Sequence, residues 1–115
     1  MKVLFICTAN RMRSLTAEEE ARKMYPDHEF KSCGTSKAKA RVFMTDDLLR
    51  WADHVIFMAD TNYAYAVKNN REALNSAKTV RIMGLLDQYK YRDPRFIQLF
   101  RTTFPDYMAT YAVIQ

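Results

Sequence analysis

Residues 3–24 read VLFICTANRMRSLTAEEEARKM and contain the stretch on which the predicted fold depends. An apolar run ends at Cys7 and a helical pattern begins near Ser14, so the residues between them should form a short loop that joins a strand to a helix. In such a loop, backbone N–H groups and the positive end of the helix dipole converge, which favours anion binding. The sequence therefore predicts an anion site that contains a thiol.

Cys7 and Arg13 lie six positions apart in this stretch, and Ser14 follows Arg13 directly. Arg13, the loop N–H groups and the Ser14 hydroxyl would favour the thiolate form of Cys7, which is the nucleophilic form. Five intervening residues suffice to surround a tetrahedral oxyanion, and the guanidinium can pair with two of its oxygens. Asn10 tolerates left-handed backbone geometry and receives a structural role. The residues expected to bind phosphate are Thr8, Ala9, Asn10, Arg11, Met12, Arg13 and Ser14.

The alternative interpretation of this stretch is purely structural. Cys7 would then be a small core residue at a strand end, and Arg13 a solvated helix residue. Cysteine and arginine occur six apart by chance in many chains, but a strand, this spacing and a helix in succession are much more specific. The sequence context therefore favours the functional interpretation.

The composition is that of one soluble domain over residues 1–115, with 49% hydrophobic and 27% charged residues. No apolar run approaches the ~20 residues of a membrane span, and there is no signal-peptide pattern, so we expect a cytoplasmic protein without membrane association. The two cysteines lack metal-ligand spacing, and no metal or cofactor is expected. The net charge of +5 favours acidic partners. No nucleic-acid-binding module is recognisable, so nucleic acid is not expected among them.

Apolar runs and helical patterns alternate along the chain, which predicts an α/β fold with a parallel sheet covered on both faces. In such sheets ligands bind beyond the carboxyl ends of the strands. A basic loop is expected at 35–41, and Pro105 should end the helix that starts at Pro94. The predicted strands are 2–7, 28–33, 54–58 and 79–85, and the predicted helices are 14–25, 45–51, 60–78, 94–103 and 107–114.

The sequence also resembles the low-molecular-weight protein tyrosine phosphatase family. The resemblance implies a single three-layer α/β domain of the phosphotyrosine phosphatase I-like fold, with a four-stranded parallel sheet in the order 2-1-3-4 flanked by helices. It further implies metal-free hydrolysis of phosphate monoesters, with phosphotyrosine in a protein as the favoured substrate. Cys7 would form a phosphocysteine while Arg13 and the loop N–H groups hold the phosphate oxygens. The matching residues are Val3, Leu4, Phe5, Ile6, Cys7, Asn10, Arg13, Ser14, Ala17, Glu18, Ser32, Gly34, Thr35, Trp51, Ala52, Asp53, Val55, Ile56, Phe57, Met58 and, more weakly, Asp87, Gln88 and Tyr89.

The family places its general acid in an Asp-Pro pair on a loop after the last strand, and two aspartates compete for that role. Asp93 precedes Pro94, but this pair in front of an amphipathic run is typical of a helix start. Asp87 matches the position instead, because it follows the last predicted strand, although Gln88 replaces the proline. We favour Asp87 as the acid and keep Asp93 as the alternative. Tyr89 and Tyr91 are expected to form a wall of the substrate pocket.

Several features depart from the family pattern. Met12 occupies the position of a second loop cysteine, Cys33 reads as a core residue, and the chain is about forty residues shorter than typical members. An inactive, phosphatase-like module that binds phosphorylated groups is therefore the alternative function. Arsenate reductase is disfavoured because residues 80–92 contain no cysteine. The sequence carries no signal for an oligomeric state.

Overall fold

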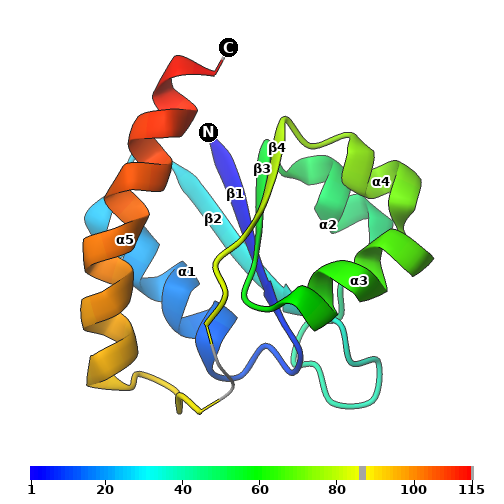
Figure 1. The fold of residues 1–115 in the computed structure, drawn as a ribbon, viewed down its shortest axis with the longest axis horizontal. Helices are drawn as coiled ribbons and strands as arrows, with labels where there is room; N and C mark the ends of the chain where they lie inside the picture. The colour runs from blue at the N-terminus through cyan, green and yellow to red at the C-terminus, as the bar shows by residue number, and fades with distance from the viewer. Residues whose placement is uncertain (86–87, 115) are drawn as a thin grey trace.

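A parallel sheet of four strands in the order β2-β1-β3-β4 lies at the centre of the structure (Figure 1). The computed structural model describes residues 1–85 and 88–114. The strand order is the one that the family resemblance implies, so the predicted fold class is confirmed. The strands are β1 (Lys2–Cys7), β2 (Glu29–Gly34), β3 (His54–Phe57) and β4 (Thr79–Ile82).

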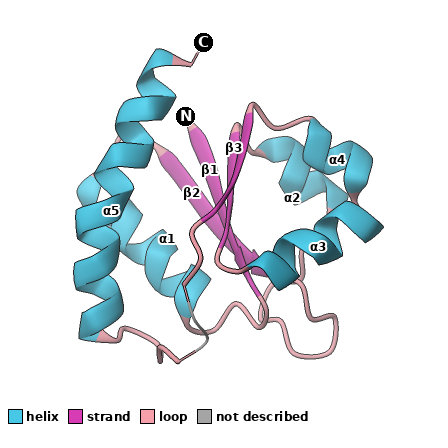
Figure 2. Ribbon diagram, in the orientation of Figure 1, coloured by secondary structure: helices cyan, strands magenta, loops and turns pink. Residues whose placement is uncertain are grey.

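Helices cover both faces of this sheet and complete a three-layer arrangement (Figure 2). Helices α1 (Arg13–Met24) and α5 (Pro94–Val113) lie on one face. The other face is covered by α2 (Asp46–Trp51), α3 (Asp60–Asn69) and α4 (Arg71–Asn75). Among the described residues, no helix is both long and apolar enough to cross a membrane.

Strand β1 is buried on both sides, because its residues alternate between two hydrophobic clusters. Phe5 contributes to the cluster under α1 and α5, where its ring packs edge-on against Phe100 and Phe104, with centroids 5.6 and 5.5 Å away. Leu4 and Ile6 contribute to the cluster on the other face. Burying each such side chain stabilises the fold by roughly 1.5–3 kcal/mol. This core fixes the end of β1, where Cys7 lies.

Two predicted boundaries are wrong. The segment predicted as one helix over 60–78 forms α3 and α4, because Asn70 leaves helical geometry with φ −139°. Its side chain donates to Asp46 Oδ1 at 2.6 Å, and asparagine readily exchanges helical bonds for such side-chain bonds. The last strand ends at Ile82 rather than at residue 85, and Gly84 turns the chain with a left-handed φ of 75°.

The predicted break at Pro105 is also wrong, because α5 continues through it. Proline inside a helix costs about 3 kcal/mol or more. Phe100 and Phe104 before it and Tyr107 and Met108 after it belong to the same buried cluster. Their combined burial outweighs the lost backbone bond, at roughly 1.5–3 kcal/mol for each large apolar side chain. Tertiary packing therefore decides the length of this helix.

Candidate active site

Residues 8–12 form the loop between β1 and α1, beyond the carboxyl ends of the strands (Figure 1). Cys7, the last residue of β1, is 3% exposed. Its Sγ accepts a hydrogen bond from the backbone N–H of Asn10 at 3.2 Å. The Ser14 hydroxyl lies 2.9 Å from the same sulfur, from where it can donate to a thiolate. The sulfur thus lies among donors at the start of a helix, which stabilises negative charge.

A buried polar network holds the loop in this shape. Asn10 has left-handed backbone geometry, with φ 54°. Its Nδ2 donates to Ser14 Oγ and to Ser32 Oγ, each at 2.8 Å. Ser32 in turn donates to Glu18 Oε1 at 2.5 Å. The network joins the loop, α1 and β2, so the donors around Cys7 are fixed before any ligand arrives.

Gly34, at the end of β2, allows the loop to approach the sheet. A Cβ added there would lie 2.3 Å from the carbonyl oxygen of Thr8, closer than any side chain can tolerate. The next residues continue the contact, since Thr35 N–H donates to Cys7 O at 2.9 Å and Ser36 N–H to Thr8 O at 3.0 Å. The site therefore requires glycine at this position for space rather than for a special backbone angle.

A cavity of about 250 Å³ opens beside the loop. Arg13, which is 4% exposed, lines it, and Nη1 of Arg13 donates to the carbonyl of Leu85 at 2.9 Å. The position of Arg13 at the cavity wall suits a guanidinium that pairs with an oxyanion. The lining residues are Thr8, Arg13, Ala59, Asp60, Thr61, Gly84 and Leu85.

Asn62 in α3 is a member of the site that the sequence analysis did not single out. The side chain is 1% exposed, and its Nδ2 donates to Thr8 Oγ1 and Thr35 Oγ1, both at 3.1 Å. It thereby ties α3 to the loop. Little in the sequence pointed to this role, because Asn62 is one polar residue in the first turn of a helix and its partner Thr8 is 54 positions away.

The segment between β4 and α5 carries the remaining predicted residues, of which Asp87 lies outside the described part of the chain. Tyr89 packs edge-on against Phe96, with ring centroids 5.6 Å apart. Tyr91 is 49% exposed, and its hydroxyl donates to Glu19 at 2.8 Å. Their described contacts thus go to α5 and α1.

Asp93 caps α5, as its sequence context predicts. Its carboxylate accepts from the N–H of Arg95 at 2.9 Å and pairs with the Arg95 guanidinium at 2.8 Å. These bonds lower the pKa of Asp93 to about 2. A carboxyl group with so low a pKa is almost never protonated at neutral pH, so it is a poor proton donor.

Arg92 anchors this segment to α1. Its N–H donates to Thr16 Oγ1 at 3.0 Å, and its guanidinium lies 2.6 Å from the carboxylate of Glu20, which is 0% exposed. Arg101 from α5 reaches the same carboxylate at 2.7 Å. Burial disfavours the charge on Glu20, but the hydrogen bonds from Arg101 and Arg92 prevail and lower its pKa. Arg92, just before α5, is thus held against the helix that follows the thiol loop.

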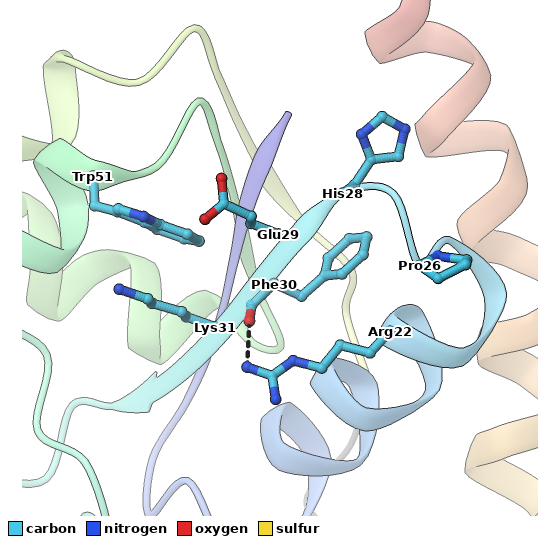
Figure 3. Close-up of a pocket in the computed structure, with 7 residues that line it drawn as sticks. All are labelled: Arg22, Pro26, His28, Glu29, Phe30, Lys31 and Trp51. Carbon is cyan, nitrogen blue, oxygen red and sulfur yellow. Dashed lines mark hydrogen bonds between the residues drawn. The ribbon is translucent and has the colours of Figure 1, made fainter.

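A second cavity, of about 360 Å³, lies on the open edge of β2 beside Trp51 (Figure 3). Arg22 donates to the carbonyl of Phe30 at 2.9 Å and pairs with Glu18 at 3.0 Å. Lys31 lies 4.5 Å above the ring of Trp51. The cations of this cavity therefore have partners within the protein. Its lining residues are Arg22, Pro26, His28, Glu29, Phe30, Lys31 and Trp51.

A parallel α/β sheet with a thiol loop that leads into the first helix is the architecture of the low-molecular-weight protein tyrosine phosphatases. The tyrosine phosphatase Wzb from Escherichia coli K30, solved with phosphate, superposes with a TM-score of 0.76 at 18% identity, over 95% of this chain and 96% of its own. The phosphatase SP-PTP from Streptococcus pyogenes gives 0.72 at 18% identity, over 95% and 91%. The arginine phosphatase YwlE from Geobacillus stearothermophilus gives 0.55 at 24% identity, over 66% and 64%.

Sequence comparison gives a shorter match. The low-molecular-weight protein-tyrosine-phosphatase PtpB from Staphylococcus aureus is 50% identical over 34 residues, which make up 30% of this chain and 24% of PtpB. No protein-family model matches the chain. The structural neighbours nevertheless bear out the resemblance seen in the sequence, and the chain has the fold of the low-molecular-weight protein tyrosine phosphatases.

Proposed function

We propose that this protein is a cysteine-dependent phosphatase that hydrolyses phosphate monoesters, with protein phosphotyrosine as its substrate. The observation that carries the proposal is the sulfur of Cys7, which lies 3.2 Å from the Asn10 N–H and 2.9 Å from the Ser14 hydroxyl. An ordinary core cysteine has no need of two polar neighbours at a helix start. A nucleophilic thiolate requires them.

The reaction has two steps. In the first, the thiolate of Cys7 attacks phosphorus, the S–P bond forms as the P–O bond to the phenol breaks, and the leaving oxygen takes a proton from a carboxylic acid. Arg13 and the loop N–H groups stabilise the equatorial oxygens, where negative charge collects. In the second step, the carboxylate left by the first step takes a proton from water as the water oxygen attacks phosphorus, and the S–P bond breaks to release inorganic phosphate. The Ser14 hydroxyl then stabilises the departing thiolate.

Asp87 is the proposed acid. Support comes from its place in the chain directly after the last strand, and from Asp93 being committed to Arg95 with a pKa of about 2. Phenol is a poorer leaving group than p-nitrophenol and depends more on protonation by the acid. Asp87→Asn should therefore slow hydrolysis of phenyl phosphate at least about 10-fold more than hydrolysis of p-nitrophenyl phosphate. Asp93→Asn is the matched control. A selective loss on phenyl phosphate in the Asp93 variant alone would reverse the assignment.

The test of the proposal itself is turnover. The protein should hydrolyse p-nitrophenyl phosphate and a phosphotyrosine peptide, and acid quenching during turnover should trap phosphate on Cys7, which mass spectrometry detects. Phosphoarginine is assayed alongside, because the neighbour YwlE is an arginine phosphatase. A protein that binds phosphate without turnover would instead be a phospho-binding module, the alternative function.

A further inference from the structure

We propose that a basic rim beside the cavity binds acidic residues that flank the phosphorylated residue of a protein substrate. The inference rests on the proposed function, because it assumes that the phosphorylated side chain enters the cavity beside Cys7. The rim consists of Arg11, Lys37, Lys39 and Arg41, all of which are exposed.

The rim lies along the loop because residues 35–41 are hydrogen-bonded to it. Ser36 N–H donates to Thr8 O, and Arg41 N–H donates to Ala9 O, each at 3.0 Å. Both segments lie beyond the carboxyl ends of the strands (Figure 1). Because Thr8 also lines the cavity, the segment that carries three of the rim residues is hydrogen-bonded to the cavity wall.

The charged side chains of the two segments that carry the rim are all positive. Residues 8–12 and 35–44 contain no aspartate or glutamate. The acidic residue of the cavity, Asp60, belongs to the α3 side. A substrate would therefore meet a directional field, with positive charge over the loop and over residues 35–41. Acidic flanks of a substrate should be drawn to that side.

The two arginines of the rim are held in place. Arg11 Nε donates to Lys39 O at 3.2 Å, and Arg41 Nε donates to Asn10 O at 3.3 Å. Each of these bonds uses the single Nε–H of its guanidinium, so the N–H groups on the two terminal nitrogens take no part in them. A side chain that is already ordered loses less entropy when it binds a carboxylate.

The composition of the rim suits a peptide better than a nucleic acid. An extended peptide advances about 3.4 Å per residue, so carboxylates within three positions of the phosphorylated residue lie within about 10 Å of it. Residues 8–12 and 35–42 contain no aromatic side chain, whereas single-stranded nucleic acids are bound by stacking on aromatic rings. The partner that the rim fits is an acidic segment of a phosphoprotein.

The test measures binding apart from turnover. Fluorescent phosphotyrosine peptides with acidic, neutral or basic flanks are titrated into the Cys7→Ser variant at low and high salt. The acidic peptide should bind about 10-fold more tightly than the neutral one, and about 0.5 M salt should reduce this preference to less than about 3-fold. Lys37→Glu with Lys39→Glu should abolish it. Lys68→Glu with Arg71→Glu, on α3 and α4, makes the same change in net charge and should retain it.

Each outcome separates the two proposals. If all three peptides bind equally while the native protein hydrolyses them, the proposed role of the rim is wrong and the phosphatase function stands. If the native protein hydrolyses nothing but the charge preference persists, the function is wrong and the rim stands. Equal losses in both double variants would show a net-charge effect and overturn the rim, as would tighter binding of an oligothymidylate than of the acidic peptide.

Discussion

The cavity beside Cys7 and the cavity on the open edge of β2 each contain an arginine, and the edge cavity is the larger, about 360 against about 250 Å³. In the edge cavity, Arg22 donates to the carbonyl of Phe30 in β2 (Figure 3). It also pairs with Glu18. In the other, Arg13 also donates to a backbone carbonyl, that of Leu85, and it directly follows the loop whose buried network surrounds the sulfur of Cys7. Neither volume nor cation count identifies the site. The arrangement of donors around a nucleophile does.

The largest expected loss of activity is that of a Cys7 variant, and its absence would remove the distinction between the two cavities. Cys7→Ser should lower kcat/KM for p-nitrophenyl phosphate at least about 1,000-fold, because a serine hydroxyl is far less ionised than a thiol. The control is Cys33→Ala in β2. Burial, with a smaller effect of the neighbouring Cys7, raises the pKa of the Cys33 thiol and keeps it protonated. The control should lose about 1 kcal/mol of stability and less than about 3-fold in activity. Similar activity in both variants would remove Cys7 from the mechanism.

The next effect compares the cations of the two cavities. Arg13→Lys keeps the charge but loses the planar fork that pairs with two oxygens, so kcat/KM should fall about 100-fold. Lys31→Met removes the charge above Trp51 and should change kcat/KM less than about 2-fold. Steady-state kinetics on a phosphotyrosine peptide measures both. A larger loss in the Lys31 variant would move the substrate site to the edge cavity.

A smaller effect concerns the contact between the loop and the sheet. Gly34→Ala places a Cβ 2.3 Å from Thr8 O, so the loop must shift, and phosphate affinity should fall about 10-fold with a loss of about 2 kcal/mol in stability. In Gly84→Ala the new Cβ meets no described atom within 4 Å, but the φ of 75° costs about 1 kcal/mol. Phosphate affinity, measured by calorimetry, should separate the variants more than melting temperature does. Equal affinities would mean that the loop tolerates the shift.

The smallest effect decides whether Asp93 belongs to the site or to the helix cap. Its folded pKa of about 2 lies below the roughly 3.9 of free aspartate, so the ionised group stabilises the fold above about pH 4. That contribution is lost as the pH falls through about 2. Asp93→Asn keeps a capping side chain and removes the charge, so the melting temperatures of the two proteins should differ most above pH 4 and approach each other as the pH falls from about 4 to about 2. A constant difference would contradict the ion pair with Arg95.

Local patterns made the first helix and the loop predictable from the sequence. An apolar run followed by a thiol, an arginine and a serine specifies the turn from β1 into α1, which begins at Arg13, one residue from its predicted start. The helix predicted to open at Thr45 is also observed, with Thr45 as its N-cap, and the Thr45 hydroxyl accepts a hydrogen bond from Leu48 N–H at 3.2 Å. Each of these features depends on neighbours within a few positions.

What the sequence did not reveal depends on distant partners. Glu20 lies beyond the first turn of α1 and pairs with Arg92 and Arg101, the latter 81 positions away. His54, the first residue of β3, is 2% exposed, and its ring stacks on that of Tyr111 with the ring centroids 3.8 Å apart. No local pattern encodes such pairs, because each side chain alone is an ordinary polar residue.

The pairing of β1 has a consequence for how the protein folds. This strand precedes the others in the chain, yet it lies between β2 and β3, with Ile6 opposite Phe57. It also packs against α5, through Phe5 and Phe100. Contacts between such distant positions form slowly, because a long loop must close first. The burial of β1 on both faces is therefore complete only after β3 has paired with it and α5, at the far end of the chain, has packed against it.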